Sequence, residues 1–302
     1  MLHARAFKVS VVWTLLLLYL GSVVHATESS LACPDWPTCF GTMLPEMTGG
    51  VFWEHLHRLV AGGLVLMFML ATWLAYKETR ARPWIFRASL FGMTLLIVQS
   101  VFGGLTVIYE LPDLISTTHL SLALLFLALA TLLASSTIVI ADSYPAPSGF
   151  RVRAWAMVLA GFVFVQSVLG GLVRHMDAGM ACPDVPLCLG QILPPLVNAP
   201  ITIHFFHRLL AILLAAAVLW FAHRVYWEET WLPIRRWAKI VAILVVLQVT
   251  LGFVSVLTLL AVIPVSLHTL LAACLLASLI HMATIFPRSS AATPGVLAPP
   301  TN

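Results

Sequence analysis

The sequence predicts an all-α membrane protein in which eight transmembrane helices form two tandem four-helix bundles, related by a pseudo-two-fold axis along the membrane normal. Three observations lead to this prediction: the composition, the number of long apolar runs and an internal repeat. Hydrophobic residues make up 61% of the 302 residues and charged residues only 9%, whereas soluble proteins contain about 25% charged residues. This composition excludes a soluble enzyme, a secreted disulfide scaffold and a nucleic-acid-binding protein.

Eight runs are long enough for a transmembrane helix, which needs about 20 mainly apolar residues. Polar segments or prolines separate successive runs, including the segment 144–149 near the midpoint and Ile263-Pro264 between the last two runs. The tail 289–302 is rich in Pro, Ala, Ser and Thr, and is predicted to be disordered. The expected spans are 6–26, 51–76, 84–108, 115–140, 153–173, 201–226, 237–260 and 264–286.

The basic residues orient these spans. With the N-terminus inside, 13 of the 16 Lys and Arg residues lie on the cytoplasmic side. Of the other three, Arg174 lies in an outer loop, and Arg58 and Arg208 lie just inside helices. The positive-inside rule therefore predicts a multi-pass protein with both termini in the cytoplasm, which we place in a bacterial cytoplasmic membrane.

The first run has an alternative interpretation as a signal peptide. Arg5 and Lys8 precede an apolar core, and Val24-His25-Ala26 could form a small-residue cleavage site. The run is long for the apolar region of a signal peptide, and it has a counterpart later in the chain. We therefore expect it to be a membrane span.

The chain contains two copies of one unit, which we expect to occupy residues 1–142 and 143–288. The segment 32–41, ACPDWPTCFG, recurs as ACPDVPLCLG at 181–190, with an offset of 149 residues. Each unit has four spans, so both copies enter the membrane in the same direction and the bundles lie side by side. Further matches pair His57-Arg58 with His207-Arg208, Gln99 with Gln248, and His119 with His268.

Four of the eleven histidines repeat by position. His57 and His207 lie near the outer ends of the second and sixth spans, and His119 and His268 near the outer ends of the fourth and eighth. Two imidazoles facing each other across a four-helix bundle are what six-coordinate haem iron requires. The alternative is that these are interfacial histidines bonded to neighbouring helices, but two pairs in register favour haem.

The residues beside these histidines admit several roles. Arg58 and Arg208 follow the first histidine of each unit, where a guanidinium group could contact haem propionates or anchor the helix at the interface. Glu54 lies three residues before His57, so a carboxylate-bridged metal site is a weaker alternative. The second unit has His204 in place of Glu54, which breaks that pattern.

Four cysteines lie in the two outer loops, where disulfides persist. Cys33 and Cys39, and likewise Cys182 and Cys188, are separated by five residues that include two prolines, so each pair could close a short loop. A stabilising bridge, a thiol relay near the reaction site and a less expected zinc site remain open at this point. Cys274, in the middle of a span, is interpreted as a small packing residue.

A glutamine-to-glycine motif recurs on three spans. It reads QSVFGG from Gln99, QSVLGG from Gln166 and QVTLG from Gln248. Small residues let membrane helices approach closely and a glutamine can bond across them, so we interpret these motifs mainly as helix-packing sites.

Together these motifs resemble the haem A synthase family. The resemblance rests on Glu54-x-x-His57-Arg58, His119, His207-Arg208, His268 and two Cys-Pro-Asp-x-Pro-x-Cys loops in a duplicated eight-span chain, and it covers almost the whole sequence. It implies an oxidoreductase that converts the C8 methyl of haem O to a formyl group, through successive hydroxylations, giving haem A for cytochrome oxidase.

The resemblance also implies a division of labour between the two units. His207 and His268 would ligate the iron of a haem b cofactor, and His57 and His119 would hold the substrate haem. Glu54, present only in the first unit, would be catalytic, as a proton acceptor or by stabilising charge at the oxidised methyl. Besides haem O, haem A and lipid, the partners implied are a haem O synthase and cytochrome oxidase assembly factors.

Two rival classes remain. A di-haem electron carrier linked to quinol would also use two bis-histidine bundles, but it would place haems near both faces, whereas all four histidines lie on the outer side. A transporter would require polar residues or broken helices near the midplane, and the sequence has few of either.

Overall fold

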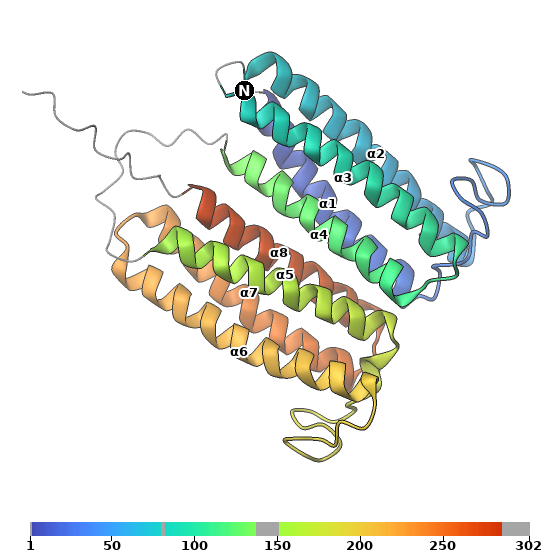
Figure 1. Ribbon diagram of the computed structural model, residues 1–302, viewed down its shortest axis with the longest axis vertical. Helices are drawn as coiled ribbons and strands as arrows, with labels where there is room; N and C mark the ends of the chain where they lie inside the picture. The colour runs from blue at the N-terminus through green and yellow to red at the C-terminus, as the bar shows by residue number, and fades with distance from the viewer. Residues whose placement is uncertain (1, 80–81, 137–150, 286–302) are drawn as a thin grey trace, which may run out of the picture.

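The computed structural model describes residues 2–79, 82–136 and 151–285, and these residues form eight α-helices and one short 3-10 helix, with no strand among them (Figure 1). All eight α-helices are long and apolar enough to cross a membrane, which confirms the predicted all-α membrane fold. The helices are α1 (Leu2–Ala26), α2 (Gly49–Glu78), α3 (Pro83–Ile108), α4 (Asp113–Ser136), α5 (Val152–His175), α6 (Ala199–Glu228), α7 (Leu232–Leu257) and α8 (Val262–Ile285), with the 3-10 helix η1 at Ala178–Met180.

Several helices extend beyond the apolar runs that predicted them. Helix α7 begins at Leu232, five residues before its apolar run, and includes Arg235 and Arg236. Apolar residues mark only the part of a helix inside the hydrocarbon, whereas backbone hydrogen bonding can continue through the polar headgroup region. The expected ends of the fourth and eighth spans, the boundary at 142/143 and the tail 289–302 lie outside the described residues.

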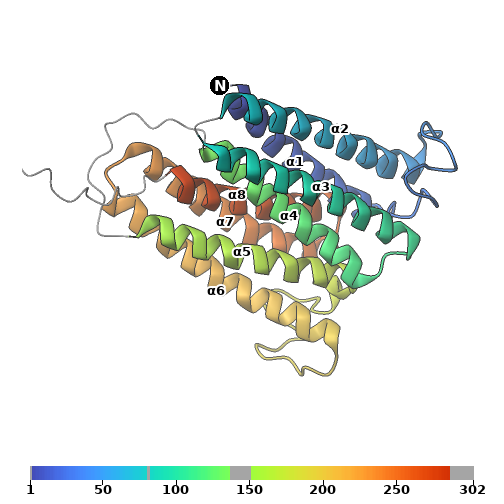
Figure 2. The ribbon, with the colours of Figure 1, turned by 45° about the horizontal axis from the view of Figure 1, so that its top comes forward.

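The helices pack as two rings of four. In the N-terminal half, α1 to α4 contact one another in sequence and α4 returns to α1, and α5 to α8 repeat this order in the C-terminal half. Helices α1, α4, α5 and α8 form the junction between the halves (Figures 1 and 2). The contacts of α1 with α8 and of α4 with α5 are equivalent under a two-fold exchange of the halves, so the packing is compatible with the expected pseudo-symmetry.

Helix α1 is fully integrated in this arrangement. It packs against α2, α4 and α8, and buries Phe7 and Leu18. Ser22 of α1 lies within hydrogen-bonding distance of Thr269 of α8, at 3.2 Å between the hydroxyl oxygens. These contacts favour the membrane-span interpretation of the first run over the signal-peptide one.

Two apolar clusters fill the molecule. One lies within α1 to α4 and is centred on three phenylalanines, in which Phe68 contacts Phe7 and Phe126 at ring-centroid distances of 5.8 and 4.9 Å. The other fills α5 to α8 and also includes Leu18, Leu124 and Leu127 from the N-terminal half. The two halves therefore share apolar packing at their junction.

Candidate functional site

The four repeated histidines lie at equivalent depths in the two halves. His57 and His207 are the ninth residues of α2 and α6, and His119 and His268 are the seventh residues of α4 and α8. All four are half-buried. The two long loops that precede α2 and α6 lie at the same end of the molecule, as Figure 1 shows, so the histidines cluster towards one face.

Each of these imidazoles rests against a glycine of the preceding helix. A Cβ added to Gly103 or Gly170 would lie 2.9 Å from Cε1 of His119 or His207, and one added to Gly252 would lie 3.0 Å from Cε1 of His268. Real Cβ contacts essentially never fall below 3.0 Å and seldom below 3.4 Å, so an added side chain would force the ring to shift. The fourth ring, that of His57, lies on Gly21 at 3.1 Å in the same way.

Three of these glycines belong to the predicted packing motifs, and each supports a histidine ring. We call the four supporting glycines, Gly21, Gly103, Gly170 and Gly252, the glycine seats. In α3 and α7 the glutamine four residues before the glycine also contacts the imidazole. The Nδ1–H of His119 donates to the carbonyl oxygen of Gln99 at 3.1 Å, and that of His268 donates to the carbonyl of Gln248 at 3.0 Å. This bond leaves Nε2 as the lone-pair nitrogen, which is the arrangement that metal-ligating histidines usually have.

The other two histidines differ from each other. Nδ1 of His207 lies 2.9 Å from the Gln166 side-chain nitrogen, which also donates to the His207 carbonyl at 2.8 Å. Nδ1 of His57 is buried and has no hydrogen-bond partner among the described residues. The repeat explains this difference, because Leu17 of α1 stands where α5 has Gln166.

The donor set fits two haems. His57 of α2 and His119 of α4 belong to the N-terminal half, and His207 of α6 and His268 of α8 belong to the C-terminal half. Each pair comes from helices that are not neighbours in sequence, and glycine seats fix the rings in an apolar bundle. Iron ligation by these residues stays a prediction.

The four loop cysteines form the expected two disulfides, Cys33–Cys39 and Cys182–Cys188. Both bridges occupy the sulfur atoms that a zinc site would need as thiolates. Cys274 is free and half-buried in α8, in line with the packing role expected for it.

Arg58 and Arg208 hold these disulfide loops against the helices. Nη1 of Arg58 donates to the carbonyls of Asp35 at 2.7 Å and Thr38 at 2.6 Å. In the C-terminal half, the corresponding bonds run from Arg208 to the carbonyls of Asp184 at 2.7 Å and Leu187 at 2.8 Å. The two guanidinium groups, for which the sequence left propionate contact and anchoring of the helix open, therefore bind loop carbonyls at the disulfide-loop end of each bundle.

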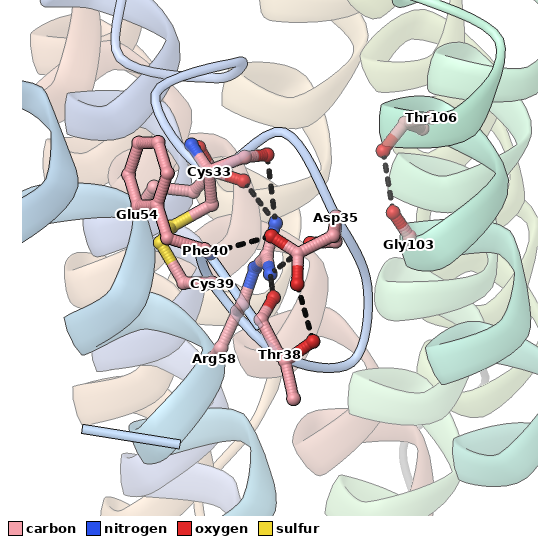
Figure 3. Close-up of polar contacts among 9 residues, drawn as sticks. All are labelled: Cys33, Asp35, Thr38, Cys39, Phe40, Glu54, Arg58, Gly103 and Thr106. Atoms are coloured by element: carbon pink, nitrogen blue, oxygen red, sulfur yellow. Dashed lines mark hydrogen bonds and ion pairs between the residues drawn. A yellow bond between two sulfur atoms is a disulfide. The ribbon is translucent and has the colours of Figure 1, made fainter. Parts of the chain in front are cut away.

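Glu54 connects the first loop to α2, as Figure 3 shows. Its carboxylate accepts hydrogen bonds from the Cys33 backbone N–H at 2.7 Å and from Nη2 of Arg58 at 2.5 Å, and the residue is only 4% exposed. His204 replaces it in the second half, where its Nδ1–H donates to the Ala178 carbonyl at 2.8 Å and its Nε2 accepts from Nε of Arg208 at 3.0 Å. A buried ion pair in one half thus corresponds to a neutral contact in the other.

An aspartate organises each loop from within. Asp35 accepts a hydrogen bond from the Thr38 hydroxyl and bonds from the backbone N–H groups of Phe40 at 2.6 Å and Gly41 at 3.0 Å. The Thr38 and Gly41 bonds stabilise the ionised carboxylate and lower the pKa of Asp35. In the second loop, the pKa of Asp184 is lowered chiefly by the bond from Gly190 N–H.

Two features near the site were not predicted from the sequence. Trp36 of the first loop packs on Gly104 of α3, where an added Cβ would lie 2.7 Å from its ring. At the junction of the halves, the rings of His25 and His175 stack at a centroid distance of 5.2 Å, and Arg174 donates to the His25 carbonyl at 3.1 Å. The glycines of the repeated motifs were the available signal for the close contacts, but a sequence does not say which side chain faces a glycine.

Comparison with known proteins agrees with this geometry. The sequence model of the COX15-CtaA family, described as cytochrome oxidase assembly protein, matches residues 46–280. Curated relatives named heme A synthase include one from Halalkalibacterium halodurans, 31% identical over 91% of this chain and 94% of the relative. Another, from Symbiobacterium thermophilum, is 30% identical over 84% of this chain and 86% of its own length. The eight membrane-spanning helices, the repeated histidines and these matches together establish that the chain belongs to the COX15-CtaA family of cytochrome oxidase assembly proteins.

Proposed function

We propose that this chain is a haem A synthase, an oxidoreductase that converts the C8 methyl group of haem O to the formyl group of haem A. The observation that carries the proposal is the set of four histidines, seated on glycines at matching depths in two adjacent bundles. Relatives that match along nearly the whole chain carry the same name. The conversion of methyl to formyl requires two hydroxylations at one carbon and the loss of one water molecule.

The two halves are proposed to hold different haems. In this proposal His57 and His119 hold haem O, the substrate, and His207 and His268 ligate the iron of haem b. When bound, haem b would supply one-electron redox chemistry. The difference between the halves supports this assignment, since only the N-terminal half has a carboxylate one turn before its first histidine.

Glu54 is the proposed catalytic residue. It lies three residues before His57 on α2, so the two side chains leave neighbouring positions on one face of the helix. A carboxylate there can accept a proton as the methyl carbon is oxidised, or stabilise positive charge near it. Its bonds to Arg58 and to Cys33 N–H hold the carboxylate in one orientation beside the loop. Arg58 and Arg208 are proposed to keep the propionate end of each site in order, through the loop carbonyls they bind.

The end of the bundles that carries the two disulfide loops is proposed to face away from the cytoplasm. This orientation follows from the excess of Lys and Arg at the opposite helix ends and leaves both termini in the cytoplasm. In a bacterium, the disulfide loops would then face an oxidising compartment. A membrane-embedded enzyme that supplies haem O, and proteins that assemble cytochrome oxidase, are the proposed partners.

Pigment analysis of purified full-length protein tests the function. We expect haem b together with haem O or haem A in the wild type, and loss of most low-spin haem b in His268→Ala, because the iron would lose an axial ligand. The matched variant His119→Ala should keep haem b and lose the substrate pigment instead. Haem b alone in the wild type would favour an electron carrier, and no haem at all would favour a transporter.

An unchanged reduced haem b spectrum in His268→Ala would overturn the ligand assignment. The two variants also control for each other, since both remove one imidazole at the same depth of a bundle.

A further inference from the structure

The four histidines differ in how their Nδ1 atoms are held. The Nδ1–H groups of His119 and His268 donate to the backbone carbonyls of Gln99 and Gln248, and Nδ1 of His207 lies 2.9 Å from the side-chain nitrogen of Gln166. Nδ1 of His57 is buried without a partner among the described residues. His57 is therefore the one imidazole of the set that no neighbouring polar group orients.

The cause is one residue of α1. In α5, Gln166 precedes the seat Gly170 by four residues, and in α1 the residue four before the seat Gly21 is Leu17. The rings themselves sit alike: a Cβ on Gly21 would lie 3.5 Å from Nδ1 of His57, and one on Gly170 would lie 3.5 Å from Nδ1 of His207. The halves thus share the seat and differ in the hydrogen bond.

Such a bond matters to a metal-bound imidazole. A partner that accepts a hydrogen bond from Nδ1–H fixes the orientation of the ring and raises the basicity of Nε2, and removal of such partners typically costs about 10- to 100-fold in metal affinity. With iron on Nε2, Nδ1 carries the proton, and a half turn of the Gln166 amide presents its oxygen to that proton in exchange for the bond that its nitrogen donates to the His207 carbonyl. Leu17 has no polar atom that could serve His57 in this way.

A second difference lowers the electrostatic attraction of the N-terminal half for an anionic ligand. Arg58 is paired with the Glu54 carboxylate at 2.5 Å. Arg208 has no carboxylate within 4.0 Å in the part of the chain that the structure describes, and contacts His204 instead. The outer end of the C-terminal site therefore keeps a positive charge that can attract haem propionates, whereas the corresponding charge in the N-terminal site is neutralised.

From these two differences we infer that His57 is the exchangeable axial ligand, whose imidazole dissociates from the haem iron when haem A is exchanged for haem O. We infer also that Gln166 keeps the haem of the C-terminal half bound throughout. The inference rests on the proposed function for the identity of the haems. It gives Leu17 and Gln166 the part of positioning residues, which set how long each half holds its haem.

The test exchanges the two side chains. Leu17→Gln, Gln166→Leu and the double variant are purified at full length in lipid nanodiscs, and haem loss is followed by transfer to excess apomyoglobin. Haem b and the substrate haem are distinguished by their pyridine haemochrome spectra. In the wild type, the haem of the N-terminal half should leave first. Leu17→Gln should slow that loss about 10-fold or more, Gln166→Leu should accelerate loss of haem b about 10-fold or more, and the double variant should reverse the order.

Leu17→Met is the control for a changed volume at the same place. A Leu17→Gln rate within about twofold of the Leu17→Met rate, at intact haem content, would overturn the inference. If Leu17→Gln does not fold, Gln166→Leu decides alone: faster loss of haem b supports the inference and an unchanged rate refutes it.

The outcome is separable from the proposed function. If the protein holds only haem b and forms no haem A, the function fails, but the effect of Gln166→Leu on the rate of haem b loss still tests the inference. Electron paramagnetic resonance gives a readout independent of exchange, because a new bond to Nδ1 of His57 should alter the g-values of one low-spin signal only.

Discussion

The N-terminal and C-terminal halves have the same framework and different contacts within it. Both seat two histidines on glycines and close a loop with a disulfide, and both clamp that loop with an arginine. Around these shared features the halves differ: Glu54 corresponds to His204 in the repeat, Leu17 to Gln166, and Trp36 to Val185. The shared residues place two histidines in the same way in each half, and the differing ones change the polar contacts beside them.

The largest expected effect comes from removing the carboxylate that only one half has. Glu54→Ala should slow formyl formation by about 100-fold or more, the lower range for loss of a positioned general base, with arrest at a hydroxylated intermediate. Haem b content should stay normal, because the C-terminal half is untouched. Pigment chromatography of membranes from a host that makes haem O measures both quantities.

Transplanting the carboxylate sharpens this result. His204→Glu in the Glu54→Ala background should not restore haem A, since the substrate would still lie beside the truncated side chain. Normal haem A from Glu54→Ala alone would remove the carboxylate from the mechanism.

Substitution of a glycine seat should abolish haem binding in one half at a time. Gly252→Val brings a side chain to about the position of the His268 ring, and is expected to abolish most haem b binding with little effect on the other haem. Gly103→Val should do the reverse through His119. Gly62→Ala in α2, where a Cβ meets nothing within 4 Å, is the matched control and should retain both haems. Equal loss of both haems in either valine variant would mean that the seats serve only the fold.

The arginine clamps should differ in their effect on stability. Arg58→Ala leaves the buried Glu54 carboxylate without its cation, and removal of one partner from a buried pair typically costs about 3–5 kcal/mol. Arg208→Ala leaves a neutral imidazole and loses only hydrogen bonds, each worth about 1 kcal/mol. Thermal unfolding in one detergent should therefore show a larger fall in Tm for Arg58→Ala. A fall of equal size in both variants would indicate that Glu54 is protonated in the folded protein.

The smallest expected effect is a pH dependence of loop stability, which both halves share through Asp35 and Asp184. The pKa values of Asp35 and Asp184 are lowered by the hydrogen bonds that their loops donate, so these bonds contribute stability above the ordinary aspartate pKa and lose it as the pH falls through the lowered values. We expect faster hydrogen–deuterium exchange in residues 33–41 and 182–190 at pH 3 than at pH 5, after correction for intrinsic rates. Asp35→Asn should remove this pH dependence from the first loop only. Protection that is unchanged at pH 3 in both loops would contradict it.

The membrane fold was largely predictable, because a long apolar run has few alternatives to a spanning helix. Both disulfides and the matching depths of His57 and His207 also followed from local spacing and the repeat. The glycine seats were visible only as a packing motif, since which ring meets Gly170 depends on how α5 and α6 pack. The contacts of Glu54 with Arg58 and the Cys33 N–H depend on the loop conformation, which spacing along one helix does not reveal.

The contact between the first and last helices has a consequence for biosynthesis. Ser22 of α1 bonds to Thr269 of α8, 247 residues later in the chain. At about 5–20 residues per second, the ribosome needs about 12 to 50 s to make the segment between them. During that interval the face of α1 that will meet α8 has no partner from its own chain, so lipid or an insertion factor must cover it. The junction formed by α1, α4, α5 and α8 can therefore assemble only after α8 has entered the membrane.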